Sequence, residues 1–301
     1  MLGKSIDLHM HSYYSDDGEF TPEELVRRCC EHGVKMMAVA DHNCVRANEA
    51  AALAAARAGI TYVPAIEIDC TFQDVNLHVL GYGIDYKSPD FAGIEENVAS
   101  QAQAASVQML DATRKMGFQV TEGEMEELAR NNFRKDIWTG EMFAEVLLNK
   151  PEYADHPLLL PYREGGERSD NPYVNIYWDY YSQGKCCYAA MQYPDLEQVV
   201  DMIHKNGGLA VLAHPGVNLK NHGELLMPIM DTGLDGLEAF SSYHSPEQAR
   251  FYYDAAKKNH FIFTCGSDYH GKTKPAICVG GHGSFVEEEE IMGQLGQILK
   301  R

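Results

Sequence analysis

The sequence has no run of apolar residues that approaches the roughly 20 needed to cross a membrane as a helix. It also begins without the pattern of a signal peptide, because a strand-like run starts at Ser5. Cationic residues are scarce: 25 Lys and Arg stand against 44 Asp and Glu, and the formal net charge is -19. A chain this acidic should not bind anionic membranes or double-stranded nucleic acid non-specifically. We therefore expect a cytoplasmic protein, in which an anionic substrate would need local positive charge at its site.

Zinc-finger spacing is also missing, although the chain has eight cysteines. Cys29 and Cys30 are sequence neighbours, as are Cys186 and Cys187, and neighbouring cysteines rarely bridge each other. The other cysteines lie in apolar strand or helix patterns. We expect reduced thiols, as is usual in cytoplasmic proteins. The sequence gives no indication of oligomeric state.

What the chain does have is a regular alternation of strand and helix patterns at both ends. Residues 21–33 predict a helix, with Thr21 as N-cap, Glu24 completing a capping box and Gly33 as the stop. Repeated strand–helix units predict a parallel sheet, closed as a barrel or open. The predicted fold class is therefore α/β, and we assign residues 1–95 and 190–301 to this domain.

The middle of the chain has a different pattern. Residues of about 95–130 predict long helices rich in Ala, Gln and Glu, whereas residues 149–185 carry Pro, Asn, Tyr and Gly without clear periodicity. We interpret residues 96–189 as an inserted, mostly helical subdomain that caps the substrate site.

The stretch "IDLHMHSYYSDDGE" at residues 6–19 places two histidines at alternate positions of a predicted strand. Successive side chains of a strand point to opposite faces, so His9 and His11 share one face. A single His-x-His could equally cap a strand or lie on the surface. The same spacing recurs at Asp268 and His270 in "GSDYH", which makes coincidence a poor explanation.

Further histidines and carboxylates end the other predicted strands. In parallel β/α barrels, functional residues gather at the C-terminal ends of strands. Imidazole and carboxylate ligands without a cysteine signature suit Zn²⁺, Mn²⁺ or Fe²⁺. We therefore predict a centre of two or three ions whose ligands come from nine residues: His9, His11, Asp16, His42, Glu67, His78, His214, Asp268 and His270.

As an ordered set, "DLHMHSYYSDDG", "ADHN", "LHVLGYGID", "AHPG" and "GSDYHG" closely resemble the motifs of the polymerase and histidinol phosphatase (PHP) superfamily of metal-dependent phosphoesterases. The resemblance covers residues 5–83 and 196–283, and not the insertion. It implies a distorted seven-stranded β/α barrel with a trinuclear site of Mn²⁺, Fe²⁺ or Zn²⁺. It also implies three ligand sets: His9, His11, Glu67 and Asp268; Asp16, His42 and His270; and His78 and His214 with Glu67 as a bridge.

Such a centre suits the hydrolysis of a phosphate ester. Three divalent ions bring more positive charge than the three predicted carboxylate ligands return, so the site would attract an anion within an acidic protein. Metal coordination also lowers the pKa of water towards neutrality. Asp41 or His244 could serve as the general acid, although Asp41 could instead orient the neighbouring ligand His42.

The insertion and the "SYHS" strand end resemble the branch of the family that hydrolyses nucleoside mono- and bisphosphates or a cyclic phosphate of ribose 5-phosphate. Nucleotide-cleaving members carry Arg-Thr-His-Phe-Ala in the insertion, whereas this chain has "GEMFA" at residues 140–144. The missing arginine weighs against a nucleotidase. Arg134, Lys185 or His244 could bind a remote part of the substrate, and Arg134 and Lys185 could equally be solvated surface residues.

We therefore predict hydrolysis of 5-phosphoribosyl 1,2-cyclic phosphate, first as a diester and then as a monoester. Hydrolysis of a nucleoside 5′-monophosphate or 3′,5′-bisphosphate is the alternative. A non-catalytic PHP-like accessory module is a further alternative, and the nine filled ligand positions weigh against it. The expected partner is thus a small phosphorylated molecule.

Overall fold

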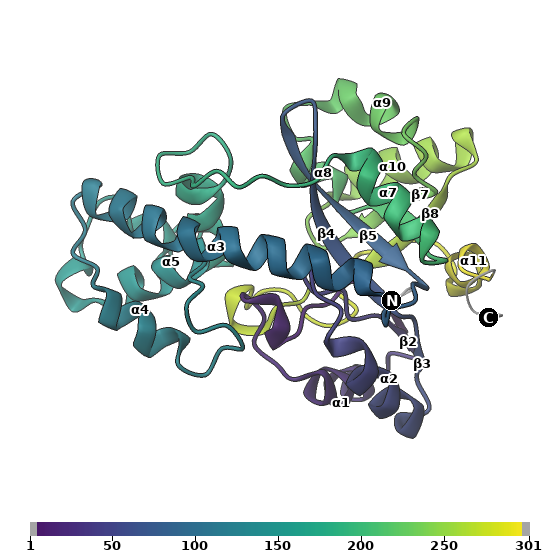
Figure 1. Cartoon of the computed structure of the whole chain (residues 1–301), viewed down its shortest axis with the longest axis horizontal. Helices are drawn as coiled ribbons and strands as arrows, with labels where there is room; N and C mark the ends of the chain where they lie inside the picture. The colour runs from purple at the N-terminus through teal and green to yellow at the C-terminus, as the bar shows by residue number, and fades with distance from the viewer. Residues whose placement is uncertain (1–4, 297–301) are drawn as a thin grey trace.

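The computed structural model describes residues 5–296, and its strands and insertion helices form two neighbouring parts (Figure 1). Within these residues the strands form one sheet of three and one of five. The three-stranded sheet is parallel and contains β1 (Ile6–Asp7), β2 (Met36–Met37) and β3 (Thr61–Tyr62). The five-stranded sheet has the order β4 (Ala65–Phe72), β5 (Val75–Tyr82), β6 (Leu209–Leu212), β7 (Gly236–Ser241) and β8 (Ile262–Gly266). The α/β class is confirmed.

The prediction of a parallel sheet is wrong for β5, which runs antiparallel to both β4 and β6. Only Gln73 and Asp74 connect β4 to β5, and their φ angles of 47° and 64° are those of a tight hairpin turn. A parallel connection would need a crossover of about a dozen residues or more. The two-residue loop therefore determines the direction of β5.

The described strands do not close into the seven-stranded barrel that the family resemblance implied. Isolated bridges join the edges of the two sheets instead, one between Met10 and Tyr269 and one between His42 and Glu67. Because β1, β2 and β3 have only two residues each, their ladders are too short to run continuously around the structure. The bridges nevertheless bring the segments that carry the predicted ligands side by side.

Helices pack around both sheets (Figure 1). They are α1 (Pro22–His32) and α2 (Ala47–Ala58) beside the smaller sheet, and α7 (Leu196–Lys205), α8 (Pro215–Asn218), α9 (Leu226–Met230), α10 (Pro246–Asn259) and α11 (Glu288–Gln294) around the larger one. The capping box of α1 is confirmed, because Thr21 and Glu24 each accept a hydrogen bond from the other's backbone N–H. Gly33, at φ 76°, ends this helix as predicted. None of the helices within residues 5–296 is both long and apolar enough to cross a bilayer.

The middle of the chain is mostly helical. It contains α3 (Pro89–Lys115), α4 (Glu122–Ala129), α5 (Gly140–Asn149), α6 (Pro172–Ile176) and the π-helical turn η4 (Tyr177–Tyr181). Short 3-10 turns are η1 (Tyr13–Ser15), η2 (Pro151–Tyr153), η3 (Leu160–Tyr162), η5 (Gly223–Leu225) and η6 (Gly271–Thr273).

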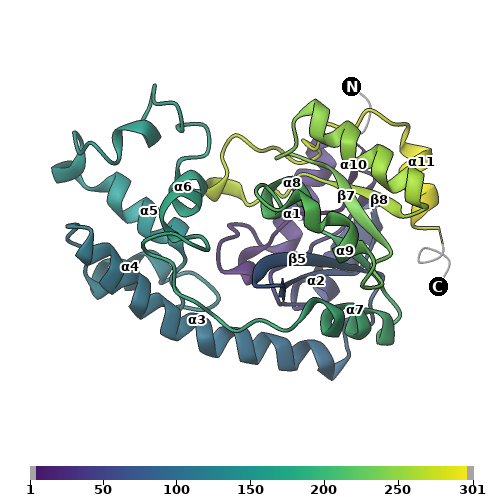
Figure 2. The same ribbon diagram turned by 90° about the horizontal axis from the view of Figure 1, so that it is seen from above.

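Helix α3 joins the two parts of the molecule, and Figure 2 shows it running from α7 to the insertion helices. Its early residues Phe91 and Ile94 lie in the core of the five-stranded sheet, whereas Leu110 packs into a separate core made by the insertion. The helix thus crosses the predicted boundary at residue 95 without a break. The division into residues 1–95 with 190–301 and 96–189 stays a prediction.

Candidate metal centre

His9 and His11 follow β1, and neither side chain is exposed to solvent. The backbone here is held against the chain after β8, because His11 N–H donates to the Tyr269 carbonyl (2.9 Å) and Asp268 N–H donates to the His9 carbonyl (2.7 Å). Gly266 at the end of β8 is required for this approach, since a Cβ there would clash with the Cβ of His9. The two imidazole rings lie together, with centroids 5.1 Å apart.

The carboxylate of Glu67, on β4, lies at the centre of the histidines and is fully buried. Its Oε2 is 3.1 Å from His9 Nε2, 3.2 Å from His11 Nε2 and 3.2 Å from His42 Nδ1, and its Oε1 is 3.0 Å from both His78 Nδ1 and His214 Nε2. Burial would raise the pKa of Glu67, but the facing imidazoles hold it well below its usual value. One ionised carboxylate therefore contacts five imidazoles.

Asp268 brings a second buried carboxylate, whose orientation is set by a buried lysine. Its Oδ1 lies 3.0 Å from His11 Nε2, and its Oδ2 accepts a hydrogen bond of 2.6 Å from Lys274 Nζ. Burial would raise the pKa of Asp268, but Lys274 and His270 hold it well below its usual value. The φ angle of Asp268 is 56°, a left-handed conformation that costs energy in a residue other than glycine and is typical of functional sites.

The two adjacent aspartates after η1 have different partners, and the predicted ligand Asp16 is not the one that faces the imidazoles. Asp17 Oδ2 lies 3.1 Å from His270 Nε2, whereas Asp16 forms an ion pair of 3.0 Å with Arg134. Gly18 directly follows Asp17 and packs so tightly against the backbone of the preceding turn that a side chain would clash.

Asp69 also faces the histidines, although it was not among the predicted residues. Its Oδ1 is 3.1 Å from His78 Nε2 and 3.8 Å from His42 Nδ1. It lies two residues after Glu67 on β4, so the two side chains share one face of the strand. The signal that identified His9 and His11, acidic or imidazole residues at alternate positions, is therefore present here too.

Four groups of these side chains are compact enough to hold a metal ion, with ligand atoms within 4.8 Å of one another. The groups are His9, His11, Glu67 and Asp268; His11, Asp17, His42 and His270; Glu67, His78 and His214; and His42, Asp69 and His78. Every predicted ligand except Asp16 falls in at least one group.

The unpaired atoms of the cluster fit a bound cation. His11 Nε2, His42 Nδ1 and His270 Nε2 are buried and have no hydrogen-bond partner, although carboxylate oxygens lie near each. Buried polar atoms are rarely left unpaired. A divalent ion between the nitrogen lone pairs and the carboxylate oxygens would satisfy both, and this donor set is the one that such ions bind.

The outer nitrogens of the imidazoles are held in place as well. Glu238, on β7, lies 3.0 Å from His9 Nδ1 and accepts a hydrogen bond of 2.9 Å from the His214 backbone N–H. Ser15 Oγ lies 2.8 Å from His11 Nδ1 and accepts a hydrogen bond from the His42 backbone N–H. Metal-binding histidines characteristically use their second nitrogen in this way, which fixes the orientation of the ring. Glu238 was not predicted from the sequence.

The two predicted general acids, Asp41 and His244, make hydrogen bonds within the protein. Asp41 is buried and accepts hydrogen bonds from the backbone N–H (2.6 Å) and the hydroxyl (2.7 Å) of Ser12. Burial raises the pKa of Asp41 to about 6. The ring nitrogens of His244 lie 3.0 Å from the Ala239 carbonyl and 3.0 Å from the Gly216 N–H. Neither residue lines the cavities beside the histidines.

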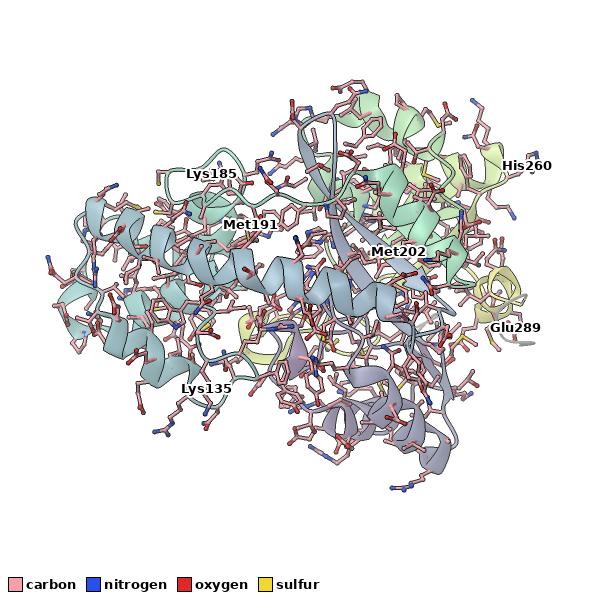
Figure 3. The ribbon with its side chains drawn as sticks, viewed as in Figure 1. Lys135, Lys185, Met191, Met202, His260 and Glu289 are labelled. Atoms are coloured by element: carbon pink, nitrogen blue, oxygen red, sulfur yellow. The ribbon has the colours of Figure 1, made fainter. Side chains whose placement is uncertain are left out.

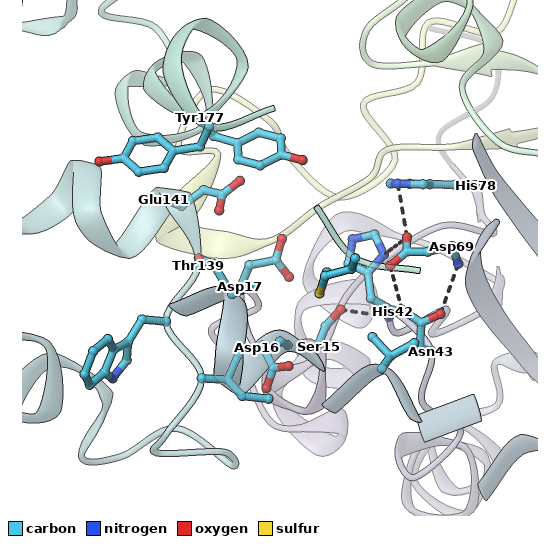
Figure 4. A pocket seen from close by; sticks show the side chains of 18 of the residues that line it. Ser15, Asp16, Asp17, His42, Asn43, Asp69, His78, Thr139, Glu141 and Tyr177 are labelled. Atoms are coloured by element: carbon cyan, nitrogen blue, oxygen red, sulfur yellow. Dashed lines mark hydrogen bonds and ion pairs between the residues drawn. The ribbon is translucent and has the colours of Figure 1, made fainter. Parts of the chain in front are cut away.

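A smaller cavity of about 220 Å³ lies between the histidine cluster and the insertion. Figure 4 shows Glu141 and Tyr177 on the side of this pocket that faces His42 and His78. Glu141 is buried at the start of α5, and burial raises its pKa to about 7. The insertion thus contributes a carboxyl group of its own to the site.

A larger cavity of about 760 Å³ begins at Asp69 and His78 and continues past Lys185 and Lys220. Its wall includes five aromatic side chains: Tyr177, Trp178, Tyr188, Tyr193 and Tyr243. Figure 3 shows Lys185 on the loop after η4, where the side chain is exposed. The predicted Arg134 lines the smaller cavity, but its guanidinium is already paired with Asp16 and, at 2.8 Å, with Glu95.

Several known proteins resemble this chain over most of its length. A phosphoribosyl 1,2-cyclic phosphate 1,2-diphosphodiesterase of Eggerthella lenta is 29% identical over 268 residues, which cover 88% of this chain and 94% of the relative. A 3′,5′-nucleoside bisphosphate phosphatase of Chromobacterium violaceum is 27% identical over 279 residues, with 92% and 90% covered. A 5′-3′ exoribonuclease of Haemophilus influenzae is 25% identical over 273 residues, with 89% and 91% covered.

A solved structure and the model of a protein family also match this chain. The structure of an amidohydrolase from Chromobacterium violaceum, with bound sulfate, has a TM-score of 0.73 and 26% identity, and 88% of this chain matches 87% of that one. The model of the PHP domain matches residues 7–282, which include both sheets and all the clustered histidines. The chain therefore belongs to the PHP domain family of metal-dependent phosphoesterases.

Proposed function

We propose that the chain hydrolyses a small phosphorylated ribose, with 5-phosphoribosyl 1,2-cyclic phosphate as its best substrate. The diester would be opened first, and the resulting monoester would then be hydrolysed in the same site. One observation carries this proposal: the buried imidazole–carboxylate cluster opens into a cavity whose free cations, Lys185 and Lys220, lie away from the cluster. A substrate with two phosphate ends would use both places.

Three divalent ions (Mn²⁺, Fe²⁺ or Zn²⁺) are proposed to bind at the three groups that share Glu67 or His11. Their ligands would be His9, His11, Glu67 and Asp268; Asp17, His42 and His270; and Glu67, His78 and His214. Asp17 replaces the predicted ligand Asp16 in the set with His42 and His270. When bound, such ions supply a nucleophilic water at neutral pH and charge stabilisation for phosphoryl oxygens.

The protein's own residues would prepare this site for an anion. Three divalent cations outweigh the charges of Asp17, Glu67, Asp69 and Asp268, and Lys274 neutralises part of the charge on Asp268. The site is therefore cationic when loaded, although the chain as a whole is acidic. Glu238 and Ser15 would keep the imidazoles oriented, and the buried Asp41 would hold the Ser12 turn beside His11.

Lys185 is the proposed ligand of the remote phosphate. It lines the larger cavity, and its side chain is exposed. We do not propose Arg134 for this role, because it pairs with Asp16 and Glu95, nor His244, because both of its ring nitrogens contact the backbone. The leaving group would take its proton from a water molecule or from Glu141. Within the described residues, Glu141 is the one carboxyl that the insertion places in the smaller cavity.

A nucleotide phosphatase is the second candidate, and one observation favours it. The five aromatic side chains of the larger cavity could stack on a nucleobase, an interaction worth about 1–3 kcal/mol per base. The cavity's volume of about 760 Å³ also exceeds what a ribose phosphate needs. A nucleoside 5′-monophosphate or 3′,5′-bisphosphate would then place its base there.

The test is a comparison of kcat/KM for the manganese-loaded protein on four substrates. These are 5-phosphoribosyl 1,2-cyclic phosphate, AMP, adenosine 3′,5′-bisphosphate and a short 5′-phosphorylated oligoribonucleotide. The proposal expects the cyclic phosphate to be the best by a large factor, and preference for any nucleotide would contradict it. Lys185→Ala should raise KM for the cyclic phosphate, whereas Lys135→Ala, outside both cavities, should not.

A further inference from the structure

Three sulfur atoms meet where the end of α3 contacts the turn after η4. The Sδ of Met116 lies 3.1 Å from Cys187 Sγ and 3.7 Å from Cys186 Sγ, and the two thiols are 4.0 Å apart. Met116 directly follows the last residue of α3, and both cysteines lie on the turn after η4. None of the three side chains belongs to the histidine cluster or lines either cavity.

Ordinary core packing explains only part of this arrangement. Cys187 is buried and belongs to the insertion core, against which Met116 packs. Cys186, in contrast, is exposed, and its thiol turns towards the other two sulfur atoms. Weak hydrogen bonds from this thiol to Met116 Sδ and to the Tyr180 carbonyl are enough to orient it, so the case for a ligand rests on the size of the sulfur triangle.

The size of the triangle suits a metal ion. From the three separations, a point equidistant from the sulfur atoms lies about 2.1 Å from each. A metal–thiolate bond is of similar length, about 2.3 Å for zinc. An ion could therefore contact all three sulfur atoms after a movement of a few tenths of an ångström.

We infer that Met116, Cys186 and Cys187 form a binding site for monovalent copper, Cu(I). Soft thiolate and thioether ligands select this ion. The thioether argues against Zn²⁺, whose usual protein ligands are thiolate, imidazole and carboxylate. No histidine or carboxylate of the described chain joins these cysteines in a metal-binding group.

Binding is a simple exchange of protons for the ion. The copper is already monovalent, so no electron is transferred, and each thiol loses one proton as its sulfur becomes a ligand. The exposed Cys186 offers the entry from solvent. A bound ion would tie the end of α3 to the turn that carries Lys185, the residue before Cys186.

The test is an anaerobic titration of the reduced, manganese-loaded protein with Cu(I) in the presence of bicinchoninate. Manganese keeps the histidine cluster occupied. We expect the chain to take one equivalent of copper from the chelator, and X-ray absorption at the copper edge to show three sulfur neighbours. Cys186→Ser and Met116→Leu should each weaken binding at least tenfold, and the leucine variant conserves volume and hydrophobicity, so the fold should persist.

Cys30→Ser is the matched control, because Cys30 is the exposed member of the other neighbouring pair. It should bind copper as the unmodified chain does. Failure of the unmodified protein to compete with bicinchoninate would overturn the inference. So would full affinity in Cys186→Ser or Met116→Leu, or a copper ion surrounded by nitrogen. None of these results bears on the proposed phosphoesterase substrate.

Discussion

The ammonium group of Lys274 lies 2.6 Å from one oxygen of Asp268, while the other oxygen of that carboxylate faces the imidazole of His11 at 3.0 Å. Both members of the ion pair are almost fully buried. The lysine therefore occupies one side of the carboxylate and leaves the other for the histidine cluster. In the metal-free protein it is also a buried cation that balances the charge of Asp268.

Lys274→Met should destabilise the metal-free protein by about 3–5 kcal/mol, because removing one member of a buried pair leaves an uncompensated charge. Added Mn²⁺ should restore much of this loss, since the ion would balance Asp268. Urea unfolding in EDTA and in Mn²⁺ measures both effects. Lys272→Met breaks only a half-exposed pair with Glu145 and should cost at most about 1 kcal/mol. Equal stability of the two variants in EDTA would contradict the expectation.

Asp17→Asn and Asp16→Asn should differ in metal content although they change neighbouring residues. Asp17 faces His270, so its loss should remove about one bound ion per chain and most of the activity. Asp16 pairs with Arg134, so its replacement should leave the metal content unchanged. Elemental analysis after dialysis checks this. If Asp16→Asn lost metal and Asp17→Asn did not, Asp16 would be the metal ligand, as first predicted.

Glu238→Gln should weaken metal binding by about 10–100-fold, the usual cost of losing a group that orients a metal ligand. Glu238 uses a different oxygen for His9 Nδ1 and for the His214 N–H, and in glutamine one of these oxygens becomes an NH₂ group, which donates and does not accept. Calorimetric titration with Mn²⁺ measures the affinity. Glu49→Gln, on the exposed side of α2, is the control. Unchanged affinity in Glu238→Gln would show that Glu238 does not position these histidines.

Glu141→Gln should lower KM for a phosphorylated substrate about two- to five-fold at pH 8, the effect of removing one screened charge. The pKa of Glu141 is raised to about 7, first by burial and then by the charge of Asp17, with Lys274 opposing. At pH 6 the native carboxyl is already protonated and neutral, so the difference should shrink. Measuring KM for the native protein and for Glu141→Gln at both pH values tests this prediction. A KM ratio that does not change with pH would contradict this reasoning.

Local features of the fold were predictable because short-range chemistry determines them. The capping box of Thr21 and Glu24 and the left-handed Gly33 define α1 without help from distant residues. The ordered motifs at the strand ends identified the PHP family, which the family comparison confirms. The direction of β5 was missed, because the Gln73–Asp74 turn lacks the Asn-Gly or Asp-Gly pair that usually marks a two-residue hairpin.

The candidate metal centre could be predicted only in part. Alternate spacing identified His9 and His11 and supported Asp268 and His270, whereas Glu67 was predicted only from its place on a strand, and the same spacing to Asp69 was overlooked. The choice between Asp16 and Asp17 depends on how the chain turns at Gly18, which sets which carboxylate meets His270 and which meets Arg134. Glu238 sits in an apolar strand pattern and shows its role only when β7 lies beside His9.

The amino-acid sequence by itself determined the helices, the strand-end histidines and the family, since each depends on residue type and spacing along the chain. The tertiary structure alone decided which carboxylate faces which imidazole, and it occupied Arg134 in an ion pair with the insertion helix α3. The physical reason is that side chains on β4, β5 and β7 meet side chains that directly follow β1 and β8 within a few ångströms. Their partners are then set by the packing of segments that are more than 250 residues apart, and no local pattern records that packing.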